Sequence, residues 1–222
     1  MSLPSGTPAE FVVPDGGAPL GLVVATDIWG LRPLFDEHAA RFAAELPAVV
    51  CVPEPFPGRD DLGTDLDRRQ VATAAKRDDD TLGDLVAAVD VLRARGCERF
   101  GMIGFCMGGM YCHKAAPTGV FDRIVSFYGM IRLPAAWALG QDQGEPLVAL
   151  ARGGDDRVLA FVGGRDEYTP LADVAALEAT RAHVVRYPEA EHGFAHDASR
   201  TTHRPGDAAD AFARAYAWLR GE

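Results

Sequence analysis

The residues Gly104-Phe105-Cys106-Met107-Gly108-Gly109 join an apolar segment, 99–105, to a segment compatible with a helix, 107–116. A cysteine in a glycine-flanked turn between a strand and a helix fits the pattern of a nucleophile elbow, in which serine is the more common nucleophile. The backbone of such a nucleophile is strained, and the residues two before and two after it crowd each other, so glycines are expected there. The first N–H groups of the helix would favour a thiolate and stabilise an oxyanion. The alternative is a glycine-rich turn in which Cys106 is only a small buried residue.

Apolar runs alternate with helix-compatible segments on both sides of this turn. We expect strands at residues 21–26, 48–52, 99–105, 124–128, 157–162 and 183–187, and helices at 33–46, 81–95, 107–116, 171–182 and 207–219. Residues 146–150 could be a further strand or a buried extended piece. Strands without polar alternation, separated by helices, predict an α/β fold: a mostly parallel, doubly wound sheet with helices on both faces. The chain is predicted to be one domain, residues 1–222.

The amino-acid composition disfavours some classes of binding partner. The 222 residues include 32 acidic and 22 basic ones, a formal charge of -10, which disfavours nucleic acid and anionic membranes as partners. No run of about 18 apolar residues indicates a membrane span, and the first ten residues do not resemble a signal peptide. With no secretory signal, the four cysteines are expected to be free thiols in a cytoplasmic protein. A monomer or a homodimer is plausible for this length.

Two further turns follow predicted strands and carry polar side chains. Asp166 lies in Gly163-Gly-Arg-Asp-Glu-Tyr-Thr-Pro170, and His192 lies in Pro188-Glu-Ala-Glu-His-Gly-Phe194. Taken singly, each is more simply a turn residue. Taken with Cys106, they give the order nucleophile, acid, histidine at three strand ends. His192 would take the thiol proton and return it to the leaving group, and Asp166 would fix the tautomer of His192.

The three motifs together resemble the dienelactone hydrolase family. The resemblance extends from about Gly21 to the last helix. It implies the α/β-hydrolase fold and a cysteine-dependent hydrolase that opens an enol-lactone to maleylacetate (carboxymethylenebutenolidase type). It also implies a small-molecule ester or lactone substrate, a Cys106–His192–Asp166 triad, a thioester intermediate, and no metal or organic cofactor.

The resemblance extends to Thr26-Asp-Ile-Trp-Gly30. In the family an acidic residue at the second position, usually Glu, holds the resting thiol, and the N–H of the next residue helps form the oxyanion hole. Mapped here, Asp27 takes the acidic role, and Ile28 and Met107 donate their N–H groups. Asp27 could equally be a turn or helix-capping residue. Trp29 would line the pocket or pack in the core.

A basic residue four positions after the catalytic histidine binds the substrate carboxylate in dienelactone hydrolase. Here that position is His196, which could bind a carboxylate when protonated or by neutral hydrogen bonding. Arg68 and Arg69 are candidates for a second basic residue of the family. The family also includes esterase-like members with other substrates.

Two other interpretations of these residues remain open. His192, His196, Asp197 and His203 are close in sequence, but they lack the spacing of a zinc-protease motif, so a metal site is disfavoured. A non-catalytic binding protein or a thiol redox sensor on the same fold would use Cys106 as an oxidation-prone thiolate.

Overall fold

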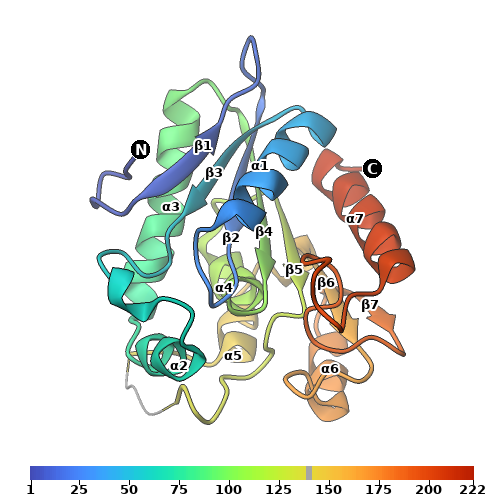
Figure 1. Ribbon diagram of the computed structural model, residues 1–222. Helices are drawn as coiled ribbons and strands as arrows, with labels where there is room; N and C mark the ends of the chain where they lie inside the picture. Colours follow the sequence, from blue (N-terminus) through green and yellow to red (C-terminus); the bar gives the residue numbers. More distant parts are fainter. Residues whose placement is uncertain (139–141) are drawn as a thin grey trace.

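One seven-stranded sheet organises the computed structural model, which describes residues 1–138 and 142–222 (Figure 1). The strand order is β1-β3-β2-β4-β5-β6-β7. β1 pairs antiparallel with β3 at one edge, and every other pairing is parallel. The mostly parallel sheet predicted from the sequence is therefore confirmed. The strands are Ala9–Val12 (β1), Leu20–Ala25 (β2), Ala48–Pro53 (β3), Arg99–Phe105 (β4), Arg123–Phe127 (β5), Val158–Gly163 (β6) and His183–Tyr187 (β7).

Helices cover both faces of the sheet, which explains why the central strands are buried along their whole length. α1 and α7 pack on one face, and α3, α4 and α6 pack on the other (Figure 1). The helices are Pro33–Glu45 (α1), Leu66–Ala74 (α2), Asp78–Ala94 (α3), Met107–Ala115 (α4), Pro146–Leu150 (α5), Leu171–Glu178 (α6) and Pro205–Arg220 (α7). None of the described helices combines the length and the apolar character that crossing a membrane requires.

Three elements differ from the sequence prediction. Residues 146–150 were expected to be extended, but they form the single-turn helix α5, whose first residue is Pro146. Proline is well suited to that position because it lacks the N–H that a first helical turn leaves unpaired. The edge strand β1 and the helix α2 were not predicted, since β1 is only four residues long and α2 carries few apolar residues.

Candidate active site

Cys106 lies between the end of β4 and the start of α4, in the backbone conformation of a strained turn. Its φ is 56° and its ψ is -114°, so a non-glycine residue occupies positive φ. A Cβ on Gly104 would lie 2.3 Å from the carbonyl oxygen of Gly108. The predicted crowding across the elbow is therefore present, and the Cys106 side chain is left partly exposed.

The second elbow glycine also brings α4 against the end of β2. A Cβ on Gly108 would lie 2.1 Å from the carbonyl oxygen of Ala25 and 2.5 Å from that of Thr26. The first turn of α4 therefore lies beside the segment that leads into Ile28. The Met107 N–H is one of the first-turn donors that a helix leaves without an internal acceptor. The structure thus places both predicted oxyanion-hole residues at the same end of the sheet as Cys106.

We expect Gly108→Ala to lower the free energy of unfolding by about 3 kcal/mol or more, because the added methyl group would overlap two backbone carbonyls. Gly83→Ala is the matched control. Gly83 lies in α3 with open space at its Cβ position, so this change should raise stability by about 0.5–1 kcal/mol. Urea unfolding of both variants measures the difference. Equal stability of the two variants would contradict the packing described here.

Arg69 binds the peptide of Ile28 at its carbonyl oxygen. Its Nη1 donates to the Ile28 carbonyl oxygen at 3.0 Å, and its Nε donates to the Gly63 carbonyl oxygen at 2.8 Å. The guanidinium also lies 5.6 Å from the Trp29 ring centre. Arg68 is exposed and lies near Asp65 instead. Neither arginine lines the cavity that contains Cys106. The structure therefore gives Arg69 a role in holding the loop and leaves Arg68 at the surface.

His192 follows β7 and Asp166 follows β6, and their side chains meet. His192 Nδ1 lies 2.8 Å from Asp166 Oδ2, and the Asp166 side chain is fully buried. The turn around Asp166 is closed by its own carboxylate, because Asp166 Oδ1 accepts the Tyr168 N–H at 2.8 Å. His192 Nε2 makes no hydrogen bond of normal geometry within the described residues. It is therefore free to exchange a proton with a neighbour.

The charge environment favours the protonated imidazole. Burial alone would lower the pKa of His192, but the charges of Cys106 and Asp166 outweigh it and raise the pKa to about 10. A histidine cation beside a cysteine is the arrangement that maintains a reactive thiolate. The Tyr168 ring packs edge-on against His192, with 4.7 Å between ring centres, and limits its rotation.

Cys106, His192, Ile28 and Trp29 line one cavity of about 560 Å³. Its wall combines apolar groups with a few charged ones, as is usual for small-molecule sites. The remaining lining residues are Leu66, Gln70, Met130, Trp137, Arg165, Glu167, Tyr168, Glu191, Arg200 and Thr202. Trp29 thus lies where the pocket-lining interpretation placed it.

Asp27 belongs to a buried network and does not line the cavity of Cys106. Its two carboxylate oxygens accept hydrogen bonds from Arg32 at 2.7 and 2.8 Å, from His196 Nε2 at 2.9 Å, and from the Trp29 N–H at 2.9 Å. These contacts hold the pKa of Asp27 well below its usual value, even though burial opposes them. The Trp29 bond makes Asp27 a turn residue, the alternative that the sequence left open. The structure does not bring its carboxylate to Cys106.

His196 is also outside the cavity. Its side chain is 1% exposed, and its ring stacks on Phe105 with 5.0 Å between centres. Nδ1 accepts from the Tyr128 hydroxyl, and Nε2 donates to Asp27. Burial lowers the pKa of His196, so the ring is neutral at pH 7. The structure therefore does not support the predicted carboxylate-binding role: both ring nitrogens are used within the protein.

Arg200 is a charged residue of the cavity that the sequence analysis did not predict. It lines the cavity half-buried, and its guanidinium lies close enough to Gly193 that a Cβ there would be 2.9 Å from Cζ. Among the described residues the Arg200 guanidinium has no ion pair and no hydrogen bond. Arg200 follows His192 by eight residues, in a loop. A loop has no hydrophobic periodicity, so the sequence gives no indication of which loop side chains face the cavity.

The residues of the metal-site interpretation, near His192, are described by the structure. Within residues 1–138 and 142–222, no three His, Cys, Asp or Glu side chains converge as metal ligands would. His196 uses both ring nitrogens within the protein, on Tyr128 and on Asp27.

The chain resembles known proteins in sequence and in fold. The model of the Dienelactone hydrolase family matches residues 8–222. A Synechocystis sp. protein assigned as a carboxymethylenebutenolidase is 33% identical over 121 residues, which cover 52% of this chain and 47% of that protein. The match thus spans about half the length of this curated relative.

Solved structures share the fold over nearly the whole chain. A Klebsiella pneumoniae protein assigned as a dienelactone hydrolase is 26% identical, with a TM-score of 0.83, over 97% of this chain and 93% of that one. The dienelactone hydrolase from Anabaena variabilis, 18% identical over 96% of this chain and 90% of that one, has a TM-score of 0.62 and shows the fold alone. With the family model matching residues 8–222, the chain belongs to the dienelactone hydrolase family.

Proposed function

We propose that this protein hydrolyses an ester or lactone through a thioester on Cys106. The observation that carries the proposal is the shared cavity: the strained Cys106 opens into it beside His192, whose Nδ1 lies 2.8 Å from the buried Asp166. A positioned cysteine with a histidine base and a carboxylate that orients the histidine is the arrangement of nucleophilic acyl transfer.

The steps follow from these positions. The Cys106 thiolate attacks the substrate carbonyl while His192 holds the proton. The N–H groups of Met107 and Ile28 stabilise the oxyanion. The carbonyl–oxygen bond then breaks, and the His192 cation protonates the departing alkoxide. Water, deprotonated by His192, attacks the thioester and releases the acid, and the proton returns to the Cys106–His192 pair.

A turnover assay with p-nitrophenyl acetate and with a dienelactone tests this proposal. We expect p-nitrophenol release to begin with a burst of about one equivalent of Cys106, followed by steady turnover. Turnover of the dienelactone would support the substrate class that the relatives suggest. If neither compound, nor a wider ester panel, is hydrolysed while peroxide oxidises Cys106 reversibly, the redox-sensor alternative is favoured instead.

Arg200 supplies the charge for a substrate carboxylate in this proposal. We expect Arg200→Met to raise KM for a carboxylate-bearing lactone by about 10- to 100-fold, because a charge-assisted hydrogen bond is lost, and to leave kcat within a few-fold.

Arg165→Met is the matched control, since Arg165 lines the same cavity but is exposed and paired with Glu189. Its KM should change little. Hydrolysis of p-nitrophenyl acetate, which has no carboxylate, should be unaffected in both variants. If Arg200→Met and Arg165→Met have equal KM values, Arg200 does not bind the substrate carboxylate.

A further inference from the structure

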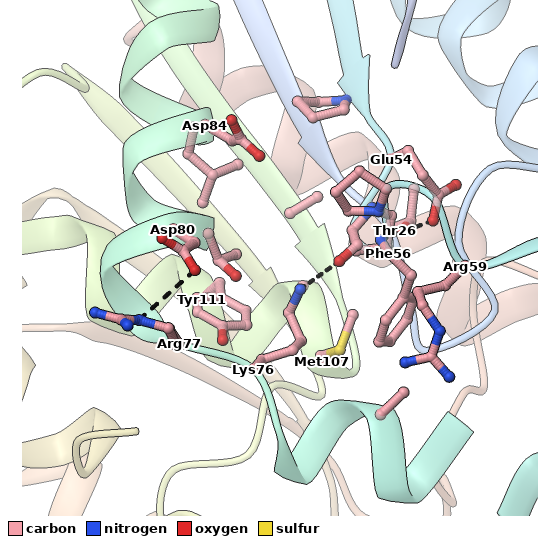
Figure 2. Close-up of a pocket in the computed structure, with 18 of the residues that line it drawn as sticks. Thr26, Glu54, Phe56, Arg59, Lys76, Arg77, Asp80, Asp84, Met107 and Tyr111 are labelled. Carbon is pink, nitrogen blue, oxygen red and sulfur yellow. Dashed lines mark hydrogen bonds and ion pairs between the residues drawn. The ribbon is translucent and has the colours of Figure 1, made fainter. Parts of the chain in front are cut away.

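A second cavity, of about 270 Å³, lies beside the first turns of α4, with Met107 and Tyr111 in its wall (Figure 2). Residues from the end of β3, the segment after α2, the start of α3 and the first turns of α4 surround it. Phe56, Leu85 and the Met107 side chain give it apolar walls. The volume is just below the range of drug-sized sites, so it suits a smaller ligand. We call it the Lys76 cavity.

The side chain of Lys76 lines this cavity, and only one of its N–H groups has a partner in the structure described. Its Nζ donates to the Pro55 carbonyl oxygen and lies 4.8 Å from the Phe56 ring centre (Figure 2). An ammonium has three N–H donors, and within the described residues no carboxylate lies within ion-pair distance of Lys76. The chain's other lysine, Lys114, is paired with Asp78 at 2.8 Å. Burial lowers the pKa of Lys76 to about 8, although neighbouring carboxylates oppose this.

Tyr111 places a second donor in the same cavity. It extends from α4 and is 2% exposed, and its hydroxyl makes no hydrogen bond of normal geometry among the described residues. Thr81 and Asp78 lie near this hydroxyl, and burial together with the Asp78 charge raises the pKa of Tyr111. The Asp78 carboxylate itself accepts from Lys114 and from the Gly144 N–H, at 2.8 and 2.7 Å. Leaving such a group unpaired costs about 1–3 kcal/mol. A ligand that accepts a hydrogen bond would remove that cost.

The acidic residues around the cavity are already occupied. Glu54 accepts the N–H groups of Leu31 and Phe56 at 2.9 and 2.8 Å, and Asp84 accepts the Ser5 and Thr7 hydroxyls at 2.6 and 2.7 Å. Asp80 lies 3.7 Å from Arg77 at the exposed rim. Each of these carboxylates thus has a donor within the protein, whereas Lys76 Nζ keeps N–H groups, and the Tyr111 hydroxyl its O–H, without an acceptor in the part of the chain that the structure describes. A ligand that supplies an acceptor would use both.

We propose that the Lys76 cavity binds a small apolar monocarboxylic acid, with the ring or alkyl body against Phe56 and Leu85 and the carboxylate accepting from Lys76 Nζ and the Tyr111 hydroxyl. Apolar walls select the body of this ligand, and the two donors select its charged head. This site is separate from the cavity of Cys106. Met107 is shared by the two: its side chain lines the Lys76 cavity, and its N–H is the proposed oxyanion donor in the Cys106 cavity. Binding in the Lys76 cavity does not depend on the proposed hydrolase activity.

Calorimetric titration with sodium benzoate tests the proposal on the full-length protein. Wild type should bind one equivalent, and benzamide, which lacks the charge, should bind about tenfold or more weakly. Lys76→Met should weaken benzoate binding by about 10- to 100-fold. Tyr111→Phe, which removes only an unpaired hydroxyl and should fold normally, should weaken it by about three- to tenfold.

Arg68→Met is the matched control, because it removes the same charge from α2 without reaching the cavity. Binding should be unchanged in this variant. The proposal is overturned if wild type does not bind benzoate, or if Lys76→Met and Tyr111→Phe, with unfolding curves like wild type, bind as well as Arg68→Met.

Discussion

Cys106→Ala should lower kcat/KM for p-nitrophenyl acetate by about 10⁴-fold or more, because no other group can form the thioester. The fold should survive, since the Cys106 side chain is partly exposed and its removal leaves no large cavity. Steady-state kinetics with an unfolding curve of the same sample measure both properties.

Cys112→Ala is the matched control. Cys112 lies on the same helix, is fully buried, and donates its thiol to the Val125 carbonyl oxygen at 3.2 Å. Burial raises its pKa well above the usual value, so it is not a nucleophile. This variant should stay active. Activity retained by Cys106→Ala would exclude the proposed mechanism. The variant Cys106→Ser tests a narrower point, whether His192 can activate a less acidic hydroxyl.

His192→Gln should lower kcat by about 10³-fold, because the proton carrier for both acylation and deacylation is lost.

His192→Gln should also change the pH dependence of the alkylation of Cys106. His192 is protonated below its raised pKa of about 10, so in wild type a cation lies beside the Cys106 side chain throughout the neutral range. Without that cation, the alkylation rate should rise only at higher pH. Iodoacetamide rates between pH 5 and about 9 measure the shift.

His183→Gln is the control for this prediction, since His183 lies exposed on β7 beside Trp218. Its kinetics and alkylation profile should match wild type. If His192→Gln alkylates with the wild-type profile, the cation at His192 does not govern the reactivity of Cys106.

The sequence predicted what local pattern can encode. The elbow glycines, the strand before Cys106 and the helix after it are neighbours in the chain, and the crowding between Gly104 and Gly108 is a property of that turn. The contact of Gly108 with Ala25 and Thr26 comes from the fold instead. Asp166 and His192 were found because each follows an apolar run that ends in a turn, and the ends of parallel strands meet at one edge of a sheet.

Contacts between distant segments were not predictable in the same way. Asp27 and His196 are 169 residues apart, and only the fold shows that they bond to each other. The two positions that the resemblance had assigned to separate roles, Asp27 and His196, thus meet as one buried pair. Arg200 and the short helix α5 were missed because a loop side chain and a single helical turn have no periodicity to detect.

The most direct test of the account is the mass of the protein during turnover. Wild type mixed with p-nitrophenyl acetate and quenched in acid within the burst should gain the mass of one acetyl group, located on the peptide that contains Cys106 and absent from Cys106→Ala. Turnover without any adduct on Cys106, or an adduct that persists in Cys106→Ala, would contradict the proposed thioester mechanism.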